Sequence, residues 1–456
     1  MSKKSAMFLL VVALAGGAYY YYRTWLHCPF LAQKKITIAG KEYDVRPKES
    51  LGEMGCRLRR VADSRNAAVL YVEASNVHET PLALHGSNPA LWDTVHDVTR
   101  SRWVDDHDLA EWLRANEECL ELLHKAARKP DCEFLVLGRA HEMAAARSLP
   151  MAPQMRGFAR LLVCEGKRHE YHNDCSRALD SYLAIAALSD HYHGSNPFLI
   201  TDLTAIACHT FRNGAVEMCL ANNDLDEKDL RRVIRKYERI LAAPLEPTDA
   251  LKREKFVTDS TIDLAIKSPE LAWIALSSSG SASAADRDTI AGLIKSRGAE
   301  LRAAYEHDYE ALMRWSALPA WQALRPENDW AGYLARLPRQ SIFSRGLLGS
   351  LGRAKKSYAR SEAESGGILI VAAIKLYERK NDRPPESLAE LKGDYISELP
   401  KDPFSGRAYI YKVRGNDWIL YSVWDNLRDD GGVGSWPHKR KTDRDFVWRN
   451  TRLPEH

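Results

Sequence analysis

The chain lacks a strong excess of charge of either sign. Its 456 residues include 65 Lys and Arg against 61 Asp and Glu, which gives a formal net charge of +4. Proteins that bind nucleic acid need a concentrated basic surface, and no basic cluster here is interleaved with the aromatic side chains of a base-stacking groove. The composition therefore argues against a nucleic-acid partner.

The sequence also lacks the short motifs of common enzymes. It contains no G-x-S-x-G motif, no P-loop and no glycine fingerprint of a dinucleotide fold. His141-Glu142 is not followed by the second histidine of H-E-x-x-H, so a zinc peptidase is not indicated. Adjacent acids such as Asp105-Asp106 point apart more often than together. No motif assigns an activity, and an enzyme is the less favoured class.

Closely spaced cysteine pairs are absent as well. Without C-x-x-C or C-x-x-C-H, neither a thioredoxin-type site nor attached c-type haem is indicated. The richest donor cluster is Cys164, His169, His172 and Cys175, whose spacing fits no standard zinc unit. We interpret these residues as packing cysteines and surface histidines, with a Cys164–Cys175 disulfide as an alternative.

The front of the chain has the features of a membrane anchor. Lys3-Lys4 precedes the uncharged stretch Ser5–Tyr22, which as a helix would span about 27 Å. Aromatic residues and Arg23 follow, and the positive-inside rule then leaves Met1 in the cytoplasm. A cleaved signal peptide is the rival interpretation, because Ala13-Leu14-Ala15 resembles a cleavage site. We favour an uncleaved transmembrane helix within residues 1–26, because the apolar character persists beyond Ala15.

The predicted fold is mainly α. After a mixed segment over residues 27–100, with a small hairpin at Lys35–Val45, apolar residues recur at helical spacing through a body over residues 101–337. Short connections favour irregular α-hairpins that resemble tetratricopeptide stacking without its strict period. Helices are predicted at 58–74, 108–128, 197–220, 226–241, 259–265 and 284–315. Two more are predicted on either side of a turn at Asn173-Asp174, one from about Gln154 that contains Phe158 and Glu165, and one that contains Ala178 and Ala186.

A glycine-bearing linker is predicted over residues 338–353, ahead of a C-terminal domain over residues 354–456. This domain begins with a long helix, whose apolar stripe is Ala359, Ala363, Gly366, Ile370, Ile374 and Tyr377. Asn381–Pro385 should stop the helix, because proline restricts the residue before it. Ser387 and Glu390 have capping-box spacing, which predicts one short helical turn.

A proline-bounded connector, Leu399–Gly406, leads to two aromatic and β-branched runs, Ala408–Val413 and Trp418–Val423. The four residues between these runs predict a β-hairpin, so the domain is α+β. An acidic loop with two glycines follows at Asp425–Gly432.

The order of LPKDPFSG, an aromatic hairpin ending in YSV, and a DDGG loop resembles the C-terminal domain of the major pseudopilins of type II secretion. The resemblance covers about the last 90 residues, and such domains also end uncharacterised helical bacterial envelope proteins. It implies a small α+β fold. The Gly-Phe-x-x-x-Glu helix with which pseudopilins polymerise has no match at Met1–Tyr22, so we do not expect a fibre subunit.

The resemblance also implies a calcium ion in the loop, with ligands at Asn426, Asp429, Asp430 and Asp445. Oxygen ligands in a flexible loop suit calcium. Trp424 and Leu427 depart from the family pattern, which usually has glycine there, and Asn426 replaces the usual aspartate. The alternative is a solvated acidic turn that closes a small sheet.

These features predict a single-pass protein of the bacterial inner membrane, with its bulk on the periplasmic side. We expect it to act as a scaffold that presents the pseudopilin-like domain to envelope or secretion proteins. The alternative is an envelope hydrolase or lyase with a site in a helical groove. That groove could use the clustered tryptophans Trp273, Trp315, Trp321 and Trp330, although we favour core packing as the explanation for them.

Overall fold

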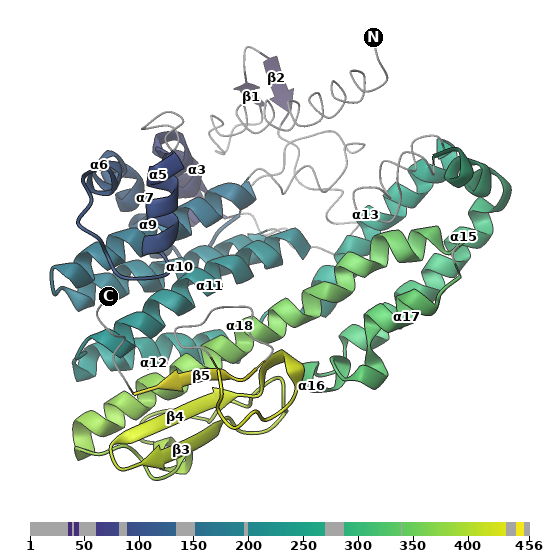
Figure 1. Ribbon diagram of the computed structural model, residues 1–456. Coiled ribbons are helices and arrows are strands. Elements are labelled where there is room, and N and C mark those ends of the chain that lie inside the picture. The colour runs from purple at the N-terminus through teal and green to yellow at the C-terminus, as the bar shows by residue number, and fades with distance from the viewer. Residues whose placement is uncertain are drawn as a thin grey trace. The chain divides into compact units, whose positions relative to one another are not determined.

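Helices account for most of the described structure, as the sequence predicts (Figure 1). The computed structural model describes residues 35–38, 41–44, 61–81, 89–133, 151–195, 199–269, 287–338, 340–434 and 444–450. The chain divides into two compact units, residues 1–215 and residues 216–456, and the boundary falls within a helix.

In the described residues of the first unit, the regular elements are helices and one small hairpin. In this hairpin β1 (Lys35–Ile38) pairs antiparallel with β2 (Lys41–Asp44), which confirms the predicted hairpin at Lys35–Val45. The helical segments are η1 (Asp63–Arg65), α3 (Ala67–Val77), α5 (Pro89–Val98), α6 (His107–Ala115), α7 (Glu117–Ala127), α9 (Met151–Tyr171), α10 (Cys175–Ser195) and α11 (Leu199–Asn222), the last of which crosses the boundary.

Helices α9 and α10 form an antiparallel hairpin at the predicted turn. Asn173 adopts a left-handed conformation with φ of 61°, which asparagine tolerates better than most residues. Gly166 allows the two helices to approach closely, because a Cβ there would lie 2.2 Å from Cε1 of the buried Tyr182. The absence of a Cβ atom at Gly166 therefore permits the close packing of this hairpin.

Two helix boundaries differ from the prediction. The helix expected over residues 108–128 is broken at Asn116, whose buried side chain accepts a hydrogen bond from the backbone N–H of Glu79 and donates to its carbonyl. The helix expected from Leu58 begins only at Ala67, where the side chain of Asn66 caps the N–H of Ala68 at 3.0 Å. Both differences arise from asparagine side chains that bind backbone groups.

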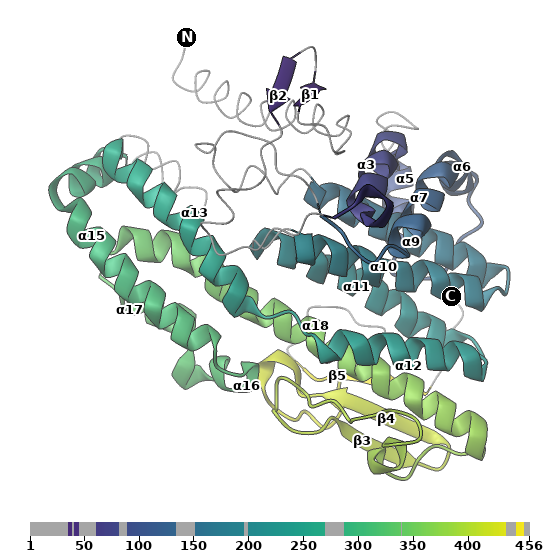
Figure 2. The ribbon, with the colours of Figure 1, turned by 180° about the vertical axis from the view of Figure 1, so that it is seen from behind.

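The second unit is built around α18 (Ile342–Asn381), which runs for 40 residues (Figure 2). α12 (Glu227–Ala242), α13 (Pro247–Lys267), α15 (Arg287–Ser316) and α17 (Trp330–Arg336) pack against it. The predicted Asp226 cap of α12 is confirmed, since its carboxylate accepts from the N–H of Asp229 at 2.7 Å. The short elements α16 (Ala320–Ala323) and η4 (Pro326–Asn328) lie between α15 and α17 in the chain.

The linker predicted over residues 338–353 is wrong for most of its length, because α18 begins at Ile342 and continues through it. Gly346, Gly349 and Gly352 suggested flexibility, yet all three lie inside the helix. Packing supplies the reason: Gly352 faces the ring of Trp330, and a Cβ there would lie 2.0 Å from its Cδ1. Glycine serves close approach here, so tertiary contact overrides its low helix propensity.

A three-stranded antiparallel sheet of order β3-β4-β5 packs against the C-terminal half of α18 (Figure 1). Its strands are β3 (Ile410–Arg414), β4 (Asp417–Ser422) and β5 (Phe446–Arg449). The predicted hairpin is confirmed, but its loop is two residues rather than four, because Arg414 pairs with Asp417. Gly415, with φ of 61°, takes the first turn position, as a type II′ turn requires. The strand β5 was not predicted.

Two further predictions for this domain are confirmed. α18 ends at Asn381, directly before Asp382, which has a left-handed φ of 55°. Ser387 and Glu390 form a capping box on η5 (Leu388–Leu391).

None of the helices in the described part of the chain has both the length and the apolarity needed to cross a membrane. The predicted anchor within residues 1–26 lies outside the described residues.

Candidate functional site

Asp402 joins the two sequence motifs on which the family resemblance rests. Its carboxylate accepts hydrogen bonds from the N–H of Phe404 at 3.0 Å, the hydroxyl of Ser422 at 2.8 Å and the N–H of Val423 at 3.3 Å. Asp402 thus ties the LPKDPFSG segment to the end of β4. Its side chain is buried, and this burial raises its pKa. The motif aspartate therefore holds the domain together.

The sheet is seated on α18 through two aromatic residues that face glycines. A Cβ at Gly366 would lie 2.5 Å from the hydroxyl of Tyr409, and one at Gly367 would lie 2.2 Å from the ring of Trp448. Tyr409 also donates to the carbonyl of Ala363 at 2.8 Å. These contacts fix the position of the sheet on the helix.

The acidic loop is closed by Asp445, which is 1% exposed. One of its carboxylate oxygens accepts from the N–H of Gly432 at 2.7 Å, and the other accepts from the N–H of Asp430 at 3.3 Å. The Asn426 amide donates to Asp430 at 2.8 Å, and Tyr421 donates to Asp429 at 3.1 Å. All four predicted calcium ligands therefore lie in one loop network.

This network does not have the arrangement of a metal centre. The carboxylates of Asp429, Asp430 and Asp445 do not bring one oxygen each within 4.8 Å of one another. Two oxygens of Asp445 already accept backbone N–H groups, so calcium would have to displace these hydrogen bonds. As arranged, the four residues fit the solvated turn better than a closed oxygen shell.

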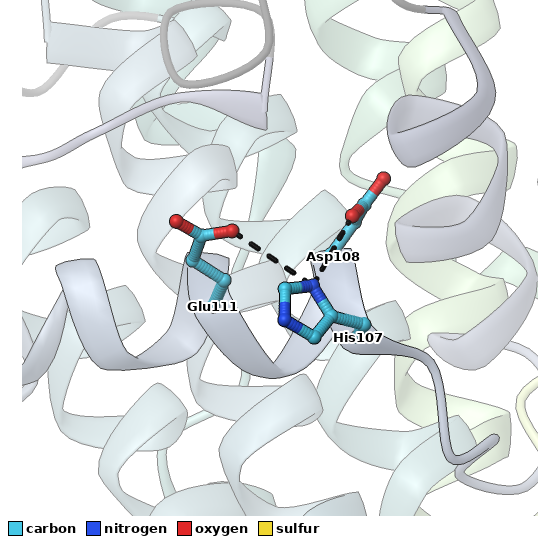
Figure 3. A group of neighbouring side chains, drawn as sticks. All are labelled: His107, Asp108 and Glu111. Carbon is cyan, nitrogen blue, oxygen red and sulfur yellow. Dashed lines mark ion pairs between the residues drawn. The ribbon is translucent and has the colours of Figure 1, made fainter.

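Within the described ranges, the one group of His, Cys, Asp or Glu whose ligand atoms do gather is His107, Asp108 and Glu111 on α6 (Figure 3). His107 Nδ1 lies 3.6 Å from Asp108 and 4.0 Å from Glu111, and its side chain is 86% exposed. The group occupies the first turns of the helix, where the helix dipole disfavours a cation. We interpret it as a solvated surface cluster.

The cluster of Cys164, His169, His172 and Cys175 does not bring three ligand atoms within 4.8 Å of one another. Cys164 is buried in α9, and Cys175 begins α10 beyond the turn. No disulfide joins them, so the alternative Cys164–Cys175 disulfide is not formed. Burial raises the pKa of the Cys164 thiol to about 12, which makes it unreactive.

Glu362 is the carboxyl group of most interest for acid–base chemistry. Desolvation, with a smaller effect from Glu246, raises its pKa, but its side chain is exposed, so the surrounding water opposes this shift. Its acidic neighbour Asp402 is buried and occupied by the hydrogen bonds given above. Asp402 is therefore not available as a second acid–base group beside Glu362.

A cavity of about 850 Å³ lies elsewhere in the second unit, next to the N-terminal half of α18. Trp315 and Trp330, two of the clustered tryptophans, line it, whereas Trp321 packs against Gly406. Trp273 lies outside the described residues. Sequence reasoning missed the basic residues of this cavity, because their regular spacing becomes visible only when residues 342–360 are taken as helix.

Comparisons of the chain with models of protein families, with curated proteins and with solved structures find no match, so the resemblance to pseudopilins rests on the motifs alone.

Proposed function

We propose that the chain is a single-pass protein of the bacterial inner membrane, anchored by its N-terminal segment, that presents a pseudopilin-like domain to envelope or secretion proteins. The observation that carries the proposal is the continuity of α18, whose C-terminal half supports the sheet while its N-terminal half packs against α15 and α17. A domain held in one orientation loses less entropy when it binds a partner.

Ionic contacts along α18 favour the same role. Arg379 pairs with Asp224 at 2.8 Å and Lys380 pairs with Glu227 at 3.0 Å, so the C-terminal end of α18 is tied to the start of α12. The N–H of Ser397 donates to Glu238 at 2.7 Å. Exposed ion pairs contribute little stability individually, but these two ion pairs and one hydrogen bond together fix the relative position of α12 and the domain.

The outer edge of β3 is the contact surface that this role favours. Among the described strands β3 pairs with β4 alone, so its other edge leaves backbone groups available to an added strand. Lys412 and Arg414 on β3 are exposed. These charges oppose indiscriminate pairing and favour a partner segment with acidic side chains.

The test is photo-crosslinking in intact cells. A photoreactive residue at Lys412 should give adducts with an envelope protein, whereas the same residue at Lys295, an exposed lysine of α15, should not. Adducts that are identical at the two positions, or a chain recovered in the soluble fraction after cell lysis, would contradict the proposal.

A further inference from the structure

The cavity beside α18 has an unbalanced set of charges. Its cationic lining residues are Arg345, Arg353, Lys356 and Arg360, and its anionic lining residues are Asp329 and Asp425. Four positive charges and two negative charges leave an excess of two. All these residues belong to the second unit.

Three of the cations form a row on one face of α18. Arg353, Lys356 and Arg360 are separated by three and four residues, so they lie on one side of the helix over about 10 Å of its length. Gly349 and Gly352 line the same cavity and add no side chains to it. The helix therefore presents its positive side chains to the cavity beside two positions that carry no side chain.

The two carboxylates in the cavity are already engaged. Asp329 caps α17, because it accepts from the N–H of Ala331 at 3.2 Å and of Gly332 at 2.8 Å. Asp425 pairs with both Lys356 and Arg360 at 2.6 Å. The internal anions thus satisfy only part of the basic row.

Two donors in the row lack an acceptor in the described structure. Arg353 is exposed, has neither a hydrogen bond nor an ion pair with any described residue, and is therefore available to a ligand. The Nε of Arg360 is buried and has no hydrogen-bond partner. A buried donor without an acceptor costs free energy, so an anion that supplied one would be stabilised here.

The cavity also has an apolar lining, whose aromatic side chains are held in place. The indole N–H of Trp315 donates to the carbonyl of Asn328 at 2.8 Å, and that of Trp330 donates to the carbonyl of Leu348 at 3.3 Å. The ring of Trp330 stacks on Tyr333 with centroids 4.8 Å apart. Since both N–H groups are used, the indoles offer the cavity carbon surface, together with Leu324 and Ile290.

We propose that this cavity binds a small organic phosphate. The dianionic head would lie among Arg353, Lys356 and Arg360, and the apolar body would lie against Trp315 and Trp330. A phosphomonoester matches the charge excess of two and offers more acceptor oxygens than a carboxylate. This binding site is independent of the proposed scaffold role.

The test uses isothermal titration calorimetry on the full chain in a neutral detergent, with phenyl phosphate as the probe. Arg353→Ala should weaken binding about ten- to a hundredfold, the usual effect of losing a charged hydrogen bond. Its matched control is Arg235→Ala, an exposed, unpartnered arginine of α12 outside the cavity. No binding of millimolar phenyl phosphate, or an equal loss in both variants, would overturn the proposal.

Asp425→Asn provides a second test. If the site is electrostatic, removing this internal competitor should tighten phenyl phosphate binding, whereas a merely structural role for Asp425 predicts weaker binding. Weaker binding with an unchanged melting temperature would contradict the proposal. If this variant does not fold, the comparison of Arg353→Ala with Arg235→Ala still tests whether the cavity binds phosphate.

Two more ligands test which chemical group forms the apolar part of the bound molecule. Inorganic phosphate should bind more weakly than phenyl phosphate, and equal affinity would overturn the role of the apolar lining. Dihexanoyl phosphatidate carries the same head on a lipid body. Tighter binding of this compound than of phenyl phosphate supports the site with a lipid as its natural source, and the reverse supports the site with a soluble phosphate.

Discussion

At the scale of single residues, the structure is governed by side chains that contact backbone or glycine. Asn116 breaks a helix, Asp402 joins two motifs, and Gly367 admits Trp448. In each case the residue is small, or its polar group binds a backbone or side-chain donor. Substitutions at such positions should therefore change stability more than the residue type alone would suggest.

Gly367→Ala should destabilise the second unit. The added methyl group would lie 2.2 Å from the ring of Trp448, which is 1% exposed and cannot move freely. Overpacking of this kind costs about 1–3 kcal/mol. Gly349→Ala is the control on the same helix, because its methyl would be 3.7 Å from Leu334, and alanine is the better helix former. Urea denaturation of both variants checks the prediction, and equal stabilities would contradict it.

His78 should make the stability of the first unit depend on pH. Burial lowers its pKa from 6.5 to about 4, and its Nε2 has no hydrogen-bond partner. Between pH 6.5 and 4 the unfolded chain therefore binds a proton that the folded chain does not. Stability should fall as pH is lowered through this window, by about 3 kcal/mol at most.

The measurement is urea denaturation at pH 7 and pH 5, for the original chain and for His78→Gln. The variant should show a smaller loss between the two pH values, because glutamine does not titrate. His107→Gln, at an exposed histidine, is the control and should retain the full loss. Identical pH dependence in His78→Gln and the original chain would rule out this role for His78.

At the scale of elements, α18 organises the second unit. Its N-terminal half lines the cavity, and its C-terminal half carries the sheet. The two proposals therefore concern opposite ends of one helix. A break in this helix should affect both, since each depends on residues placed by the same backbone.

Gly349→Pro tests whether residues 342–353 act as helix or as linker. Proline inside a helix removes a hydrogen bond and costs about 3 kcal/mol or more. We expect a lower melting temperature and less helical circular dichroism than in Gly349→Ala. A linker would tolerate the proline, so an unchanged melting temperature would show that the helix is not required.

At the scale of the whole molecule, stability can report on the calcium that the family resemblance implies. A ligand that binds only the folded chain raises its stability, by about 2.7 kcal/mol at a hundred times its dissociation constant. If calcium binds, it should raise the melting temperature of the full chain relative to chelator. The increase should disappear in Asp430→Asn and persist in Asp394→Asn, an exposed aspartate outside the loop.

Equal melting temperatures with millimolar calcium and with chelator would dismiss a stabilising ion. That result would leave Asp445 as the residue that closes the loop through its two backbone hydrogen bonds. The loop would then be the solvated turn that the sequence offered as the alternative.

By itself the sequence determined the helical class, the hairpin of β3 and β4, the capping box of η5 and the end of α18, because these depend on local periodicity, turn residues and proline. The apolar stripe was also correct, since Ala363, Ile370 and Ile374 are completely buried.

Tertiary structure alone decided the remainder. Glycines at 346–352 suggest a linker in the sequence, but in the structure Trp330 packs on Gly352 and the segment is helical. The segment β5 forms a strand because it pairs with β4, as Val447 does with Tyr421. The cavity joins α18 to residues from α15, α16, α17 and the short helical turn η6 (Trp424–Asn426), which no local pattern links. Local preferences are small compared with the free energy of packing, so contacts between distant segments settled each of these points.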